Sequence, residues 1–374
     1  MEPAPLRALV VYGTRPEAIK MAPVVAAMRA RPDRFAVRTC ATGQHREMLH
    51  QVEGLLGLRT DIDLGLMRPD QSLNGLAAAA ILTLDATFAA ERPDWVLVQG
   101  DTTTAMSAAL AAFHRGLRLG HVEAGLRTGD LASPFPEEAN RRVIDALATT
   151  LFAPTSRAAE TLAREGRPAE RIHLVGNTGI DALLAVAADL EPAVEEPEVL
   201  VTLHRRETFG PALAAILEAL RRLAAEFPEV TWVYPVHPNP SARGPARAML
   251  GGLPNLRLCE PLDYRALVTQ LLRCRLVLTD SGGLQEEAPA FGKPVLVVRD
   301  ATERPEGVAA GTARLVGTSP ERIVREATLL LRDAAARERM ARAVNPYGDG
   351  HAAARIAAIL AGEPWTPFAA DPSR

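Results

Sequence analysis

The chain has 374 residues, of which 48% are hydrophobic and 23% charged, and its formal net charge is -3 at pH 7. This length exceeds what one ordinary hydrophobic core serves, so it predicts two domains. The small negative charge argues against a nucleic-acid-binding domain, which is normally basic, and an anionic ligand would therefore need a local cluster of cations.

The first predicted strand covers residues 8–12, and a helical pattern follows over 17–28. Between them stand Arg15 and Pro16, with Lys20 one turn further on. Proline fits the first helical position and leaves free N–H groups there, while the two cations add charge at the same place. These residues favour an anion site, and the alternative is a capped helix with two solvated cations.

Further strands are predicted at 36–39, 95–98, 117–122 and 150–153, with helical stretches at 73–88 and 104–114. Asp101 follows the strand 95–98, and Glu123 follows the strand 117–122. Each carboxylate alone could be a helix N-cap. Two of them at strand ends of one domain favour acid/base chemistry.

A proline-rich loop at residues 133–136 leads to Glu137 and, one helical turn later, to Arg141. Glu137 would stand in the first turn of a helix with Arg141 on the same face. The pair could therefore belong to the same site as Asp101 and Glu123. The competing interpretation is that Glu137 only compensates the helix dipole.

An acidic connector with a proline at each end spans residues 192–197, and the alternation of strands and helices then restarts. Strands are predicted at 199–203, 231–236, 256–258, 276–278 and 295–298. His204 and Arg205 follow the first of these, a combination that suits phosphate or a departing diphosphate. His237 follows the second strand in a rigid turn and could be purely structural.

The strand 276–278 leads into Ser281, Gly282 and Gly283, and Glu287 stands one turn further on. Adjacent glycines at a strand-to-helix turn let backbone amides approach a phosphate closely. An acidic residue one turn into such a helix could reach a ribose diol. Arg304 follows the strand 295–298 and could add a further cation.

Alternating strands and helices in both halves predict an α/β fold with two Rossmann-like parallel sheets. Ligands of such sheets bind beyond the carboxyl ends of the strands, so two such domains would face each other across a cleft that holds the active site.

Several common signals are missing from the sequence. It holds no GxxxxGKS/T loop and no HExxH, and its GxG at residues 348–350 does not follow a predicted strand. The histidines lack ligand spacing, so neither NAD nor a metal is expected. Three widely separated cysteines suit a reducing compartment. No stretch reaches roughly 18 uncharged apolar residues, so we expect a cytoplasmic protein without a membrane span.

Together these segments resemble the bacterial non-hydrolysing UDP-N-acetylglucosamine 2-epimerases. The matching runs keep the family's order over nearly the whole chain. They are residues 13–23, 43–49, 99–104, 121–127, 133–142, 203–207, 235–239, 278–287, 299–306 and 345–350.

The resemblance implies the glycosyltransferase-B arrangement of two domains, a homodimer and no added cofactor. It places the N-terminal domain at residues 1–174, joined by a C-terminal helix over 352–374, and the UDP-binding domain at 175–351. It also implies reversible conversion of UDP-N-acetylglucosamine to UDP-N-acetylmannosamine by elimination of UDP to 2-acetamidoglucal and re-addition. The product would supply N-acetylmannosamine for cell-surface polysaccharide.

The resemblance further assigns residues to roles. The catalytic centre would consist of Asp101, Glu123, Glu137 and His204. The UDP-sugar would be held by Arg15, Lys20, Arg141, Leu262, Leu267, Ser281, Gly282, Gly283, Glu287 and Arg304. Leu262 could offer uracil only its peptide group, and Leu267 could offer only packing.

Some family members are activated by a second substrate molecule bound beside the active site. The matching positions here are Gln44, Glu138, Arg205 and His237. Glu47 and Asp70 depart from the family pattern, and an extra acid near a diphosphate is repelled by it. These departures argue against activation by substrate.

Three rival functions stay open on sequence grounds. A relative that hydrolyses the intermediate would release N-acetylmannosamine and UDP. A retaining glycosyltransferase of the same architecture would share the diphosphate site but would need an acceptor pocket. A non-catalytic UDP-sugar sensor would not need Asp101, Glu123 or Glu137. The three carboxylates at strand ends favour the epimerase.

Overall fold

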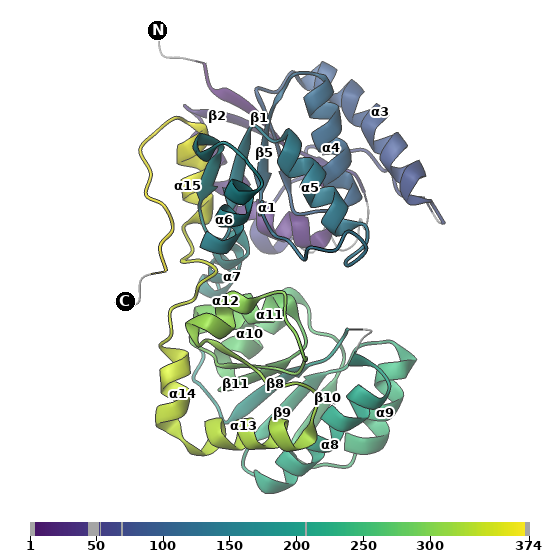
Figure 1. Cartoon of the computed structure of the whole chain (residues 1–374), viewed down its shortest axis with the longest axis vertical. Coiled ribbons are helices and arrows are strands. Elements are labelled where there is room, and N and C mark those ends of the chain that lie inside the picture. The colour runs from purple at the N-terminus through teal and green to yellow at the C-terminus, as the bar shows by residue number, and fades with distance from the viewer. Residues whose placement is uncertain (1–3, 44–51, 53, 69, 206–207, 371–374) are drawn as a thin grey trace. The chain divides into compact units, whose positions relative to one another are not determined.

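The computed structural model describes the chain except residues 1–3, 44–51, 53, 69, 206–207 and 371–374. The chain divides into two compact units (Figure 1). The first contains Met1–Ala185 and Gly348–Ala369, and the second contains Val186–Tyr347. The domain boundaries predicted from the sequence, after residue 174 and before residue 352, stay a prediction.

The first unit is built on a seven-stranded sheet in which all neighbouring strands are parallel. Its order is β3 (Ile62–Asp63), β2 (Phe35–Ala41), β1 (Leu6–Tyr12), β4 (Trp95–Gln99), β5 (Arg118–Val122), β6 (Thr150–Ala153) and β7 (Ile172–Leu174). Its helices are α1 (Arg15–Arg29), α3 (Leu73–Glu91), α4 (Thr103–His114), α5 (Glu137–Leu147), α6 (Ser156–Arg164), the 3-10 turn η1 (Ala169–Arg171) and α15 (Ala352–Leu360). The helix α7 (Thr178–Ala188) begins in this unit, and its last three residues belong to the second.

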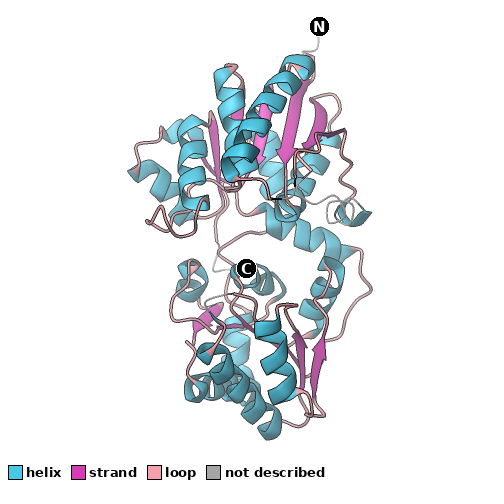
Figure 2. Cartoon of the chain, turned by 90° about the vertical axis from the view of Figure 1, so that its right-hand side faces the viewer, coloured by secondary structure: helices cyan, strands magenta, loops and turns pink. Residues whose placement is uncertain are grey.

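Both faces of this sheet are covered by helices, as the two views show (Figures 1 and 2). Along β1, Val10 and Tyr12 join a core with α1 and α15, whereas Leu9 and Val11 join a core with α3 and α4. Side chains of a strand alternate between the two faces, so a strand covered on both sides must be apolar throughout. This is why β1 reads as a continuous aliphatic run.

The second unit contains a six-stranded sheet, also parallel throughout. Its order is β10 (Leu256–Cys259), β9 (Thr231–Pro235), β8 (Glu198–Thr202), β11 (Leu276–Thr279), β12 (Val295–Val297) and β13 (Ala313–Leu315). Its helices are α8 (Pro211–Glu226), α9 (Pro240–Leu250), α10 (Tyr264–Arg273), α11 (Gly282–Glu287), η3 (Ala288–Phe291), α12 (Pro305–Ala310), α13 (Pro320–Arg332) and α14 (Ala334–Ala341).

Two parallel sheets confirm the predicted α/β class, and each strand expected from the sequence is present. The strands β3, β7 and β13 were not predicted, because runs of two or three residues carry too little periodicity. The predicted C-terminal helix ends at Leu360, and no helix or strand follows among the described residues up to position 370.

The helix α3 is the one helix of the described chain that is long and apolar enough to cross a membrane by length and composition. Its Leu76, Ala80, Leu84 and Phe88 are buried, and it packs against α4. In this fold α3 is therefore a partly buried helix of the first unit.

Asp181 on α7 joins this helix to the start of α15. Its Oδ1 accepts the N–H of Ala353 at 2.8 Å, whereas its buried Oδ2 has no hydrogen-bond partner among the described residues. Burial raises the pKa of this carboxyl to about 6, although the backbone donors of α15 favour the charged form.

We predict that Asp181→Asn stabilises the protein above pH 6. The folded pKa lies above the unfolded one, so ionisation of Asp181 costs stability as the pH rises through about 6. Asparagine keeps an oxygen for Ala353 and avoids a cost of about 1–3 kcal/mol. Urea unfolding should show this gain at pH 8 and a smaller gain at pH 5. The exposed Asp33→Asn is the control, and a destabilised Asp181→Asn protein at pH 8 would contradict the interpretation.

Candidate functional site

The strands β1, β4 and β5 are neighbours in the first sheet and point the same way. The residues that follow them therefore lie at one edge of that sheet. This edge carries Arg15 in the first turn of α1, Asp101 after β4 and Glu123 after β5. The structure thus brings together carboxylates and cations that the sequence separates by more than eighty residues.

Asp101 is fixed from α5 by two contacts. Its Oδ2 accepts a hydrogen bond from Arg141 Nη2 at 2.6 Å, and its backbone carbonyl accepts one from Asn140 Nδ2 at 2.9 Å. The preceding Gly100 has a φ of 73°. A positive φ costs glycine little, so the chain can turn sharply here and present Asp101 to α5.

Glu123 has a left-handed backbone with a φ of 68°, which is uncommon for a residue with a side chain. Its carboxylate forms an ion pair with Lys20 on α1 and accepts a hydrogen bond from Gln99 Nε2 at 2.9 Å. A strained backbone persists only when its surroundings hold it, and such residues cluster at functional sites.

Glu17 is buried beneath this edge and was not singled out from the sequence. It accepts from the backbone amides of Gly13 and Thr14 and, through Oε1, from the hydroxyl of Thr102 at 2.7 Å. Burial raises its pKa despite these bonds. Glu17 therefore links the loop after β1 to the loop after β4.

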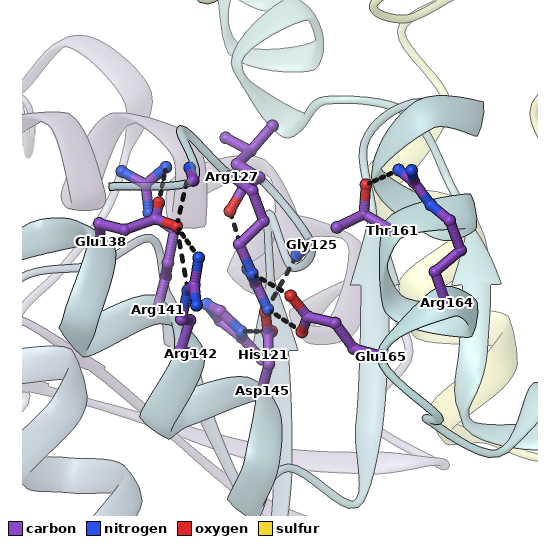
Figure 3. Close-up of polar contacts among 12 residues, drawn as sticks. His121, Gly125, Arg127, Glu138, Arg141, Arg142, Asp145, Thr161, Arg164 and Glu165 are labelled. Carbon is purple, nitrogen blue, oxygen red and sulfur yellow. Dashed lines mark hydrogen bonds and ion pairs between the residues drawn. The ribbon is translucent and has the colours of Figure 1, made fainter. Parts of the chain in front are cut away.

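Glu137 begins α5, as predicted, and its Oε2 is buried without a hydrogen-bond partner among the described residues. Its neighbour Glu138 is fully buried. Glu138 accepts from the amides of Thr128 and Gly129 and from the guanidinium of Arg142 (Figure 3). Burial raises its pKa, but these donors outweigh it and the pKa is lowered.

Both oxygens of Glu138 thus have partners within the protein, as Figure 3 shows. Glu138 was predicted for the second substrate site. Here its carboxylate holds the loop that precedes α5 by accepting backbone hydrogen bonds from that loop. Gln44 and Glu47, which belong to the same prediction, lie outside the described residues. Asp70, the other departure from the family pattern, has a left-handed backbone with a φ of 54°.

In the second unit Asp280 organises the edge of the sheet. It is fully buried after β11 and accepts from the amides of His204 and Arg205 and from the hydroxyl of Thr208. His204 Nδ1 lies 3.3 Å from Asp280 Oδ1, and the imidazole is half exposed. Partial burial lowers the pKa of His204, although Asp280 opposes this effect.

The cations of the second unit are held by carboxylates. Arg205 pairs with Glu303, and Arg304 pairs with Glu286. Burial raises the pKa of Glu303, but the donors around it, Arg205 and Arg299 among them, outweigh burial and lower it to about 2. Arg205 follows β8, and Arg304 lies between β12 and α12. Guanidinium groups such as these can bind an anion.

Gly282 lies against these pairs, because a Cβ atom there would come within 3.0 Å of Glu303 Oε1 and 3.3 Å of Arg205 Nη2. A side chain at this position would therefore displace one of the two groups. Gly283 is exposed, and a Cβ atom there would meet only Ser281 Oγ, at 3.9 Å. Ser281 stands at the N-cap position of α11 without a side-chain cap hydrogen bond. The absence of side chains leaves the backbone here accessible to a ligand.

Glu287 ends α11, and its charge adds to burial in raising the pKa of Tyr264. Tyr264 begins α10, and its buried hydroxyl has no hydrogen-bond partner among the described residues. Leu262 precedes this helix and Leu267 lies within it, both half-buried. His237 Nδ1 accepts the amide of Asn239 at 3.1 Å, which supports the structural interpretation of that turn.

No group of three or more His, Cys, Asp or Glu side chains in the described chain could hold a metal ion. The carboxylates at the edges of both sheets are paired with lysine or arginine side chains. This arrangement suits an anionic ligand and proton transfer.

Comparison with known proteins identifies the family. The model of the family described as UDP-N-acetylglucosamine 2-epimerase matches residues 26–361. The chain belongs to the UDP-N-acetylglucosamine 2-epimerase family. This confirms the resemblance deduced from the sequence.

Individual relatives agree. A probable UDP-N-acetylglucosamine 2-epimerase of Ralstonia nicotianae is 50% identical over 365 residues, which cover 94% of this chain and 97% of the relative. The UDP-N-acetylglucosamine 2-epimerase of Escherichia coli is 48% identical over 370 residues, which cover 95% of this chain and 98% of the relative. The UDP-N-acetylglucosamine 2-epimerase of Neisseria meningitidis, in a crystal structure bound to UDP-N-acetylglucosamine, is 41% identical in sequence with a TM-score of 0.86. The match covers 96% of this chain and 100% of that chain.

Proposed function

We infer that this chain is a non-hydrolysing UDP-N-acetylglucosamine 2-epimerase, an isomerase that interconverts UDP-N-acetylglucosamine and UDP-N-acetylmannosamine. Membership of the family and the Neisseria meningitidis relative bound to UDP-N-acetylglucosamine support this function. The observation in the fold that carries it is the pair of ion-paired carboxylates, Asp101 and Glu123, at adjacent strand ends.

Inversion at C2 needs a C–H bond to break where no carbonyl activates it. Departure of UDP solves this problem, because breaking the C1–O bond gives the ring oxocarbenium character and makes the C2 proton acidic. The C1–O electron pair leaves with UDP, a carboxylate takes the proton, and the C2–H pair forms the double bond of 2-acetamidoglucal. Protonation from the other face and re-addition of UDP give the epimer. The sequence of steps is redox-neutral, so we propose that it needs no NAD.

The first unit would handle the proton. Asp101, Glu123 and Glu137 are the candidate acid and base, because one group must accept a proton and another must donate one. Asp101 is pinned by Arg141 and Glu123 by Lys20, so each carboxylate has a fixed position. Proton transfer depends on such fixed geometry.

The second unit would hold the leaving nucleotide. His204, Arg304 and the backbone at Gly283 are proposed to contact the diphosphate, with Glu287 proposed for the ribose and the backbone of Leu262 for uracil. Cations that stabilise charge on the departing group supply the electrostatic part of catalysis. Arg15, Lys20 and Arg141 of the first unit complete the proposed set.

We predict that product formed in D2O carries deuterium at C2 and that Asp101→Asn abolishes or severely slows both epimerisation and exchange. A carboxylic acid proton exchanges with solvent much faster than the enzyme turns over. Proton NMR of the enzyme with UDP-N-acetylglucosamine alone measures both events. Asp333→Asn, at a helix cap of the second unit, is the control and should leave exchange unchanged.

The same spectrum separates the rival functions. A hydrolysing enzyme would release free N-acetylmannosamine, a glycosyltransferase would leave C2 unchanged, and a sensor would give no reaction. Complete retention of the original hydrogen at C2 in UDP-N-acetylmannosamine made in D2O would contradict the elimination mechanism.

Arg304→Ala should weaken UDP binding by about 1.5–3 kcal/mol, the range for hydrogen bonds to charged groups. The guanidinium is held near β12 by Glu286, so it is already in place for a diphosphate. Isothermal calorimetry with UDP measures the loss. Arg325→Ala on the exposed face of α13 should change nothing, and equal affinities of both variants would move the nucleotide away from Arg304.

We also propose a homodimer that contacts through α3. This helix exposes Leu82, which is 73% accessible, and the exposed Ala78 and Ala86, four residues to either side, lie on the same face. An apolar helix face in water is stabilised when a second copy covers it.

Three free cysteines, together with a nucleotide-sugar substrate, support the cytoplasm as the proposed location.

Leu82→Glu should shift the protein from dimer to monomer in sedimentation velocity, because it would place two carboxylates in the covered face. Leu329→Glu, at an exposed leucine of α13, is the matched control and should stay dimeric. A wild-type protein that sediments as a monomer would contradict the proposed assembly.

A further inference from the structure

A chain of charged groups, most of them buried, links β5 to α5 and α6 in the first unit (Figure 3). It begins at His121 on β5, whose side chain is completely buried. One ring nitrogen, Nδ1, lies 2.6 Å from Asp145 Oδ1, and the other, Nε2, lies 2.8 Å from the carbonyl oxygen of Gly100. His121 and Asp145 have no role in the function proposed above.

The hydrogen bonds of His121 determine its protonation. A backbone carbonyl can only accept, so Nε2 must donate to Gly100. Asp145 also accepts from the amide of Gly125 at 3.2 Å and pairs with Arg127 at 2.7 Å, which suits a carboxylate and not a carboxylic acid. Nδ1 must therefore donate as well, and an imidazole that donates from both nitrogens is an imidazolium.

Asp145 carries the negative charge at the centre of this chain. Burial alone would raise its pKa, but His121 and Arg127 outweigh burial, so the pKa of Asp145 is lowered. Arg127 continues to Glu165, which accepts from Nε at 2.8 Å and Nη2 at 2.7 Å. Two cations thus alternate with two carboxylates, and the buried charges are compensated.

Two members of this chain, His121 and Asp145, contact the backbone beside the two candidate catalytic carboxylates. The Gly100 carbonyl that accepts from His121 belongs to the residue before Asp101. The Gly125 amide that donates to Asp145 stands two residues after Glu123. No other residue fits at Gly125, because its φ is 88° and a Cβ atom there would lie 2.4 Å from the carbonyl oxygen of Ala158.

Asp145 lies on α5, the helix that also supplies the contacts of Asn140 and Arg141 to Asp101. One helix therefore fixes Asp101 directly and, through Asp145, fixes the turn that contains Glu123. We propose that His121, as an imidazolium, and Asp145 are positioning residues that set the separation of Asp101 and Glu123 for proton transfer. The proposal deepens the proposed epimerase function and rests on it.

Nitrogen-15 NMR of the wild-type protein tests the charge. Both ring nitrogens of His121 should show the shifts of protonated imidazolium nitrogens, because each faces a hydrogen-bond acceptor. The resonances are assigned by their loss in His121→Gln. A neutral tautomer would overturn the imidazolium assignment.

Kinetics test the positioning. His121→Gln and Asp145→Asn should each lower kcat by about 100-fold, the effect of a misplacement near 1 Å. The affinity for UDP, measured by calorimetry, should stay within about twofold, because a purely local shift of the proton-transfer groups leaves the nucleotide contacts in place. Loss of folding alone would instead lower the active fraction and the number of UDP sites together, with no change of kcat per site.

Matched controls exist in the same unit. His173→Gln changes a half-buried histidine of β7, and Asp94→Asn changes an aspartate paired with Arg7 at the opposite end of the sheet. Both should keep wild-type kcat. If wild-type protein lacks epimerase activity, the proposed function fails. If it is active and folded His121→Gln and Asp145→Asn proteins keep full kcat, the positioning role fails. If one variant does not fold, the other variant and the wild-type NMR spectrum decide.

Discussion

Buried carboxylates that accept backbone N–H groups are the interaction on which both polar sheet edges depend. The loops after parallel strands have no ladder partners, so their amides need other acceptors. In this chain Glu17, Glu138, Asp145 and Asp280 provide them, and each is at most 2% exposed. Each of these residues ties amides of one loop to a helix or a neighbouring strand end, and these contacts fix the positions of the candidate site residues beside them.

The electrostatic environments of these carboxylates differ in a way that explains their pKa values. Glu17 is surrounded by neutral donors, Thr14 and Thr102 among them, and burial raises its pKa. Asp145 is equally buried, but the cations His121 and Arg127 beside it lower its pKa. Hydrogen bonds from neutral groups thus do not offset the loss of water around a charge, whereas two adjacent cations do.

The cations proposed to bind the nucleotide are paired with carboxylates in this fold. Lys20 contacts Glu123, Arg141 contacts Asp101 and Arg304 contacts Glu286. If the diphosphate binds as proposed, it competes with these carboxylates for the same cations. The charge on the candidate acid and base would then respond to the arrival and departure of the nucleotide, because Coulomb interactions over such distances are strong outside bulk water.

The sequence by itself determined the α/β class, each longer strand and the polar groups that follow the strands, because continuous aliphatic runs predict strands of a parallel sheet covered on both faces. It also determined the family, since the motifs are long and ordered. Only the tertiary structure decided which charges meet. Lys20 and Glu123 are 103 residues apart, and His121 and Asp145 are 24 apart. In sequence, Asp145 resembles any solvated helical aspartate and His121 any polar strand residue. Their burial and pairing follow from the order of strands β4 and β5 and the packing of α5 over them, which local periodicity does not encode.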